Sequence, residues 1–152
     1  MSAATSVKLV IPSEIRFVDL IHDASEKVAV MSGFNEDESL NVGLAVREAV
    51  INAIKNGNRL DPARKVEVTL LSKGDAMSAR VVDQGRGFDP SASPDPTSEE
   101  NLLRTSGRGL LLIRSFVDAV DFDFRPGRGM AVTLTKMIRP ESRASANIIQ
   151  GR

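Results

Sequence analysis

The chain has 152 residues, which suits a single domain and is long enough to bury a sizeable core. Its 20 basic residues balance 20 acidic ones, so it lacks the overall positive charge by which nucleic-acid-binding proteins attract phosphate backbones. The absence of cysteine excludes disulfides, thiolate catalysis and zinc sites built on sulfur, and it fits a reducing compartment. No secretory signal is recognisable, and no apolar run approaches the roughly 18 residues of a spanning helix. We therefore expect a soluble cytoplasmic protein that contacts neither membrane nor nucleic acid directly.

Apolar periodicity, interrupted by proline, glycine and asparagine, predicts helices and strands in an order typical of α+β proteins. In chain order the predicted elements are a strand at 7–11, a helix from 14 to 31, a second helix from 36 to 56, strands at 66–70 and 77–82, a helix at 110–116, and strands at 120–124 and 130–135. This order predicts a two-layer α/β sandwich with a mixed, mostly antiparallel sheet and helices on one face. Residues 1–139 would form the domain, and residues 140–152 a mobile tail.

Capping residues support the two long helices. Ser13 is placed to cap the first, and Asn35, with Glu38 three residues later, marks the start of the second. Gly57 and Asn58 mark its end.

The second helix carries an unusual polar stripe. On a helical wheel with about 100° per residue, its apolar side chains cover most of the circumference, so the helix should be largely buried. Asn41, Glu48, Asn52 and Lys55 nevertheless fall within about 60° of one another. A carboxylate buried without partners is costly, so the stripe should line a polar site. A solvated face with an i, i+4 Glu–Asn pair would explain the spacing equally well.

Two glycine motifs add to the stripe. Asp83 ends a predicted strand and is followed by Gly85 and Gly87, where a backbone can approach a ligand closely. Gly107, Arg108 and Gly109 precede a predicted helix, whose free N–H groups suit a phosphate. Between the motifs, residues 84–106 form a long aperiodic segment of the kind found in functional lids.

Two common phosphate-binding motifs are excluded. No glycine-lysine-serine or glycine-lysine-threonine sequence occurs, so there is no P-loop. The first glycine motif leads into Phe88, Asp89 and Pro90 rather than a helix, which excludes a Rossmann fingerprint.

Taken in this order, the three signals resemble the Bergerat-fold ATPases, the group that includes DNA gyrase, MutL and histidine kinases. Glu48 to Gly57 resembles the family's asparagine box, Asp83 to Phe88 its first glycine box and Arg104 to Leu110 its second. Within the group, the short chain and the glutamate four residues before the asparagine resemble bacterial anti-sigma-factor serine/threonine kinases. The sequence departs from the family pattern at Asn56, where histidine is common, and at Met130, where threonine is common.

The resemblance implies cofactors and roles for individual residues. The cofactors would be ATP and Mg²⁺, with Asn52 holding Mg²⁺ against the phosphates, Asp83 accepting a hydrogen bond from the adenine amino group and Glu48 acting as general base. The remaining ATP-binding residues would be Lys55, Gly85, Gly87, Arg104, Gly107, Arg108 and Gly109. Residues 84–106 would form the ATP lid.

The resemblance also implies partners and leaves three functions open. The first is a serine/threonine kinase that binds a sigma factor and phosphorylates an anti-sigma-factor antagonist. The second is an ATP-gated binding module without phosphotransfer. The third, a histidine-kinase fragment, would need a phosphorylatable histidine, and only His22 is available. Dimerisation is implied by the resemblance alone.

Overall fold

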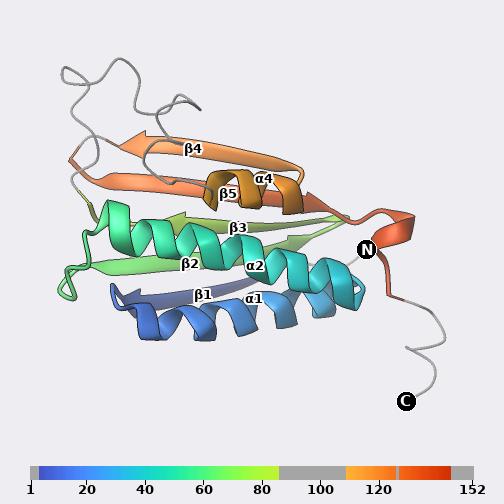
Figure 1. Ribbon diagram of the computed structural model, residues 1–152. Helices are drawn as coiled ribbons and strands as arrows, with labels where there is room; N and C mark the ends of the chain where they lie inside the picture. The colour runs from blue at the N-terminus through green and yellow to red at the C-terminus, as the bar shows by residue number, and fades with distance from the viewer. Residues whose placement is uncertain (1–3, 86–108, 126, 145–152) are drawn as a thin grey trace.

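One antiparallel sheet is covered on a single face by helices (Figure 1). The computed structural model describes residues 4–85, 109–125 and 127–144. In chain order the elements are β1 (Thr5–Pro12), a 3-10 turn (Ile15–Phe17), α1 (Val18–Ser32), α2 (Glu36–Asn52), a π-helical turn (Ala53–Gly57), β2 (Lys65–Lys73), β3 (Ala76–Val82), α4 (Gly109–Phe116), β4 (Ala119–Arg125), β5 (Gly129–Met137) and a 3-10 turn (Pro140–Ser142). Every predicted helix and strand is present.

The five strands lie in the order β1-β2-β3-β5-β4, and each neighbouring pair of these described strands is antiparallel. The sandwich prediction is confirmed, although the parallel pairing that a mixed sheet allows does not occur among them. The β2–β3 hairpin turns at Gly74, whose φ of 59° favours glycine. Because β3 and β5 are both interior strands, their ends have neighbours on both sides.

The core lies between the sheet and α1 and α2. Along β2 the inward residues Val66, Val68 and Leu70 are fully buried, whereas the residues between them are half-buried, as the period of two requires. In α2, Ala45, Val46 and Val50 are buried against this surface. No helix in the described residues is long and apolar enough to cross a membrane. The buried face of α2 fixes which of its residues point elsewhere, and those include the polar stripe.

Ser13 does not cap a helix, so that prediction was wrong. The N-cap position of α1 is Phe17, which makes no side-chain cap hydrogen bond. The Ser13 side chain is instead buried, where Oγ donates to the carbonyl oxygen of Arg64 at 2.8 Å and accepts from Asn58. A buried hydroxyl between tertiary partners is better satisfied than one at a solvated helix start.

Asn35 caps α2 as predicted, and it also holds the end of the described chain. Its Oδ1 accepts from the Glu38 N–H at 2.8 Å, and its Nδ2 donates to the Glu141 carbonyl. The Asn35 N–H donates to the Ser142 carbonyl at 2.7 Å, and Ser142 is buried. Residues 140–144, predicted to belong to a mobile tail, are therefore bonded to the α1–α2 junction, while residues 145–152 lie outside the described part.

Candidate functional site

The polar stripe of α2 meets the start of α4. Glu48 and Asn52 are half-buried, one helical turn apart, and Gly109 opens α4 beside them. A Cβ atom placed on Gly109 would lie 3.1 Å from Glu48 Oε2 and 3.3 Å from Asn52 Nδ2. The structure thus brings together three residues that the sequence placed in two separate motifs. Because Gly109 has no side chain, the ends of the Glu48 and Asn52 side chains can face the first residue of α4.

Asp83 follows the end of β3 and is 6% exposed. Its Oδ1 accepts from the Gly85 N–H at 2.9 Å, an Asx turn, and from the Met130 N–H at 3.1 Å. The Asp83 N–H donates in turn to the Met130 carbonyl at 3.0 Å. Two backbone donors therefore hold one carboxylate oxygen, which fixes the direction in which Oδ2 points. Met130 contributes through its backbone, a role that does not need the threonine side chain common in the family.

Three glycines pack against Asp83 and its neighbourhood so closely that none has room for a side chain. A Cβ on Gly57 would collide with Asp83 Oδ2, and one on Gly129 would collide with the Asp83 carbonyl oxygen. A Cβ on Gly85 would collide with the Gly57 carbonyl oxygen. Gly129 also has a φ of 99°, in the left-handed region. The Asp83 carboxylate thus lies in a cradle of backbone atoms from the end of the asparagine-box helix, the first glycine box and the start of β5.

Burial raises the pKa of the Asp83 carboxyl group. Hydrogen bonds from Gly85 and Met130 oppose that rise, as do the positive charges of Arg125 and Arg64. Burying the Asp83 carboxylate costs desolvation free energy, but it keeps a hydrogen-bond acceptor at the end of β3. An acceptor of this kind suits a ligand that brings a polar N–H group, such as the amino group of adenine.

Several predicted site residues cannot be compared with the structure. Gly87, Arg104, Gly107 and Arg108 lie outside the described residues, as does most of the predicted lid. Lys55 is described and exposed on the π-helical turn, and its contact with a nucleotide stays a prediction.

Sequence reasoning missed three residues of the site, Gly57, Gly129 and Asn58. Gly57 closes the stretch that resembles the asparagine box, but it and Asn58 were interpreted only as the end of a helix, and Gly129 was not assigned to the site. The signal for Gly129 was weak, because a glycine beside a strand start is common. Asn58 is 0% exposed, and its side chain connects segments far apart in sequence, which no local pattern reveals.

The residues present fit both ATP and Mg²⁺. The carboxylate of Glu48 and the amide oxygen of Asn52 are hard donors of the type that Mg²⁺ and its waters prefer. The glycine cradle leaves the Asp83 edge free of side chains from Gly57 and Gly129, as close approach by a flat base requires. Only four residues separate Asn52 from Gly57, so the two groups lie at the same end of α2.

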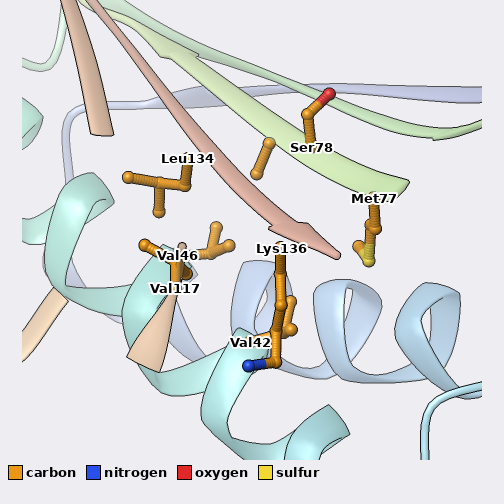
Figure 2. A pocket seen from close by; sticks show the side chains of 8 residues that line it. Val42, Val46, Met77, Ser78, Val117, Leu134 and Lys136 are labelled. Atoms are coloured by element: carbon orange, nitrogen blue, oxygen red, sulfur yellow. The ribbon is translucent and has the colours of Figure 1, made fainter. Parts of the chain in front are cut away.

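A hollow lies away from these groups, toward the opposite end of α2 (Figure 2). It measures about 220 Å³ including the solvent at its mouth, and it is lined by Val42, Val46, Met77, Ser78, Ala79, Val117, Leu134 and Lys136. The Lys136 ammonium is engaged by Glu38 at 2.7 Å and by the Phe116 carbonyl at 3.1 Å. This hollow shares no residue with the Glu48 and Asp83 groups.

Comparison with known proteins gives consistent results. A family model described as Histidine kinase-like ATPase domain matches residues 11–136. An anti-sigma F factor of Oceanobacillus iheyensis is 31% identical over 125 residues, covering 77% of this chain and 85% of the relative. A serine-protein kinase RsbW of Listeria monocytogenes is 26% identical over 138 residues, covering 87% of each chain. The solved RsbU and RsbW domains of a Mycobacterium tuberculosis protein share the fold with a TM-score of 0.60 at 19% identity, covering 93% of this chain and 35% of the longer solved chain.

Proposed function

Because the chain belongs to the histidine kinase-like ATPase family, we propose that it is an ATP-dependent serine/threonine protein kinase that also acts as an anti-sigma factor. The proposed partners are a sigma factor and an antagonist protein whose serine or threonine is phosphorylated. Relatives named anti-sigma F factor and serine-protein kinase RsbW support both halves of the proposal. The single observation that carries it is the meeting of Glu48 and Asn52 at Gly109.

The geometry supports a division of work between the two side chains. ATP supplies the phosphoryl group when it is bound. The Asn52 amide oxygen would hold Mg²⁺, and the Glu48 carboxylate would accept the proton of the attacking hydroxyl. The new bond forms between that hydroxyl oxygen and the γ-phosphorus, and the bond from phosphorus to the β–γ bridging oxygen breaks as ADP leaves. Glu48 is half-buried beside the first residue of α4, an observation that supports this role.

An ATP-gated switch without phosphotransfer is the second candidate. In such a switch Asn52 would still hold Mg²⁺ and Asp83 would still bind adenine, but Glu48 would have no proton to accept. Glu48 therefore distinguishes the two candidates, because a binding module gains nothing from a carboxylate beside the anionic phosphates.

The histidine-kinase alternative is not supported by the place of its histidine. His22 is 15% exposed, its Nε2 faces Glu26 at 3.3 Å, and it packs against Gly43 of α2. A phosphoacceptor needs an accessible ring, which this position does not offer.

The deciding experiment is phosphotransfer from radiolabelled ATP to candidate antagonist proteins. The wild type, Glu48→Gln and Asn52→Ala should be compared in transfer and in calorimetric Mg-ATP binding. We expect Glu48→Gln to bind and not transfer, and Asn52→Ala to bind Mg-ATP weakly. A wild type that binds ATP and labels no partner would favour the switch, and one that does not bind millimolar Mg-ATP would overturn both candidates.

A further inference from the structure

Asn58, immediately after the π-helical turn, is a polar side chain with 0% exposure. Its Nδ2 donates to Ser13 Oγ at 2.7 Å and to the Lys65 carbonyl at 2.9 Å, and its Oδ1 accepts from the Gln84 N–H at 2.7 Å. Both amide hydrogens and the amide oxygen are thus used. A buried carboxamide costs little when it is satisfied in this way.

The Asn58 carboxamide takes the place of a peptide group between two strands. The β2–β3 ladder ends where Glu67 pairs with Val82, and the same register would bring Val66 opposite Asp83 and then Lys65 opposite Gln84. At that level Asn58 lies between the Lys65 carbonyl and the Gln84 N–H and bonds to both. The Lys65 N–H closes the ring by donating to Gln84 Oε1 at 2.5 Å.

This arrangement fixes Asp83 from both sides. Toward β5, Asp83 is held by its two bonds to the Met130 backbone. Toward β2, the next residue, Gln84, is held by Asn58. Gly57, which faces Asp83 Oδ2, directly precedes Asn58 in the chain. One side chain therefore sets the spacing between the end of the asparagine-box helix and the strand end that carries Asp83.

We propose that Asn58 is a positioning residue for base recognition: its carboxamide aligns the Asp83 carboxylate so that a purine with a 6-amino group is preferred over one without. This inference rests on the proposed function, in which Asp83 accepts a hydrogen bond from adenine. Asn58 does not touch the nucleotide, so it acts on the base-dependent part of affinity and leaves the phosphate-dependent part to Asn52 and its neighbours.

The test compares the dissociation constants of ATP and purine riboside triphosphate, which lacks the 6-amino group, for the wild type and two variants. Asn58→Ala should lower the preference for ATP by about tenfold, the equivalent of about one misaligned hydrogen bond. Ser13→Ala is the matched control, since it removes bonds from the same buried network and leaves the Gln84 contact intact. It should lose stability and keep the preference.

The outcomes separate this inference from the proposed function. If the wild type binds neither nucleotide, or both equally, the base-recognition part of the proposed function falls and this inference with it. If the wild type prefers ATP and Asn58→Ala prefers it equally, only the Asn58 inference is overturned. Equal losses for both nucleotides would also overturn it, because they indicate a purely structural role.

A measurement on the wild type keeps the inference testable if Asn58→Ala does not fold. Gln84 is exposed, so its backbone amide should exchange rapidly with solvent unless the Asn58 bond protects it. NMR should show a slowly exchanging Gln84 amide, with a through-hydrogen-bond coupling to the Asn58 carboxamide. Rapid exchange would contradict the alignment on which the inference depends.

Discussion

The two halves of the candidate site differ in whether backbone or side-chain atoms form them. The Asp83 end is a cradle of backbone atoms, in which Gly57, Gly85 and Gly129 leave no room for a methyl group. The Glu48 end is formed by the tips of two side chains, which lie 3.1 and 3.3 Å from the place that a Cβ on Gly109 would take. Backbone cannot move without disturbing the sheet, whereas side-chain tips can rotate. The Asp83 end, proposed to bind the base and called the base end below, should therefore be rigid and selective. The Glu48 end, proposed to bind the phosphates and called the phosphate end below, should be adjustable.

The largest expected effect falls on catalysis at the adjustable end. Glu48→Gln keeps the size of the side chain and removes the proton acceptor, so transfer to an antagonist protein should fall by about 10²- to 10⁴-fold. The dissociation constant for Mg-ATP, measured by calorimetry, should change less than about threefold. A comparable loss of binding would show that Glu48 holds the nucleotide and would remove the distinction between the two halves.

Adding one methyl group at Gly129 tests whether the base end is rigid. Gly129→Ala places a Cβ against the Asp83 carbonyl and forces an alanine into a φ of 99°. Gly33→Ala is the matched control, since its φ is 107° and, among the described residues, no other atom lies within 4 Å of the place of its Cβ. Urea unfolding should show a loss of about 1–2 kcal/mol for Gly33→Ala and about 3 kcal/mol or more for Gly129→Ala. Equal losses would mean that the backbone around Asp83 shifts to make room for the methyl group and is not rigid.

Asp83→Asn should separate ATP affinity from stability. The carboxamide oxygen of this variant can still accept hydrogen bonds from the Gly85 and Met130 N–H groups. Its NH₂ group then lies where Oδ2 lies in the wild type. There it would face the amino group of adenine, so that two hydrogen-bond donors meet without an acceptor. ATP affinity should fall by about 30- to 150-fold, from a loss of about 2–3 kcal/mol. Retained affinity would exclude Asp83 from base recognition.

The difference in stability between this variant and the wild type should depend on pH in a defined direction. Burial raises the pKa of Asp83 in the folded state, so the stability linked to its protonation is present at low pH and is lost as the pH rises through the folded pKa. Asp83→Asn avoids that loss and should melt at or above the wild-type temperature at pH 7.5, with the difference shrinking in acid. Wild-type ATP affinity should weaken as Asp83 takes up its proton. A variant that is less stable at neutral pH than in acid, relative to wild type, would contradict the raised pKa.

The smallest effect should come from Gly109→Ala. Its Cβ would press on the ends of Glu48 and Asn52, which can turn aside, so the unfolding free energy should change by less than about 1 kcal/mol. Displacing both tips should still slow phosphotransfer by about tenfold. A severe loss of stability would show that the phosphate end is as rigid as the base end.

Much of this architecture could be predicted because its signals are local. The period of two in β2 and the narrow polar stripe on the otherwise apolar α2 each follow from side chains a few residues apart, and all the predicted elements formed. Asn35 caps α2 because its partner is only three residues away. Ser13 carries a similar local signal and was assigned wrongly, because its bonds go to Arg64 and to Asn58, 45 residues away.

The sequence by itself determined the sandwich, the polar stripe with Glu48 and Asn52, and the acid at the end of β3. Only the tertiary structure decided that Gly109 faces that stripe, that Gly57 and Gly129 enclose Asp83, and that Asn58 replaces a peptide group between β2 and β3. The physical reason is that periodicity and capping act within a few residues along the chain. Close backbone approach and buried carboxamide bonds depend instead on where distant segments meet, as in the pairing of Asp83 with Met130.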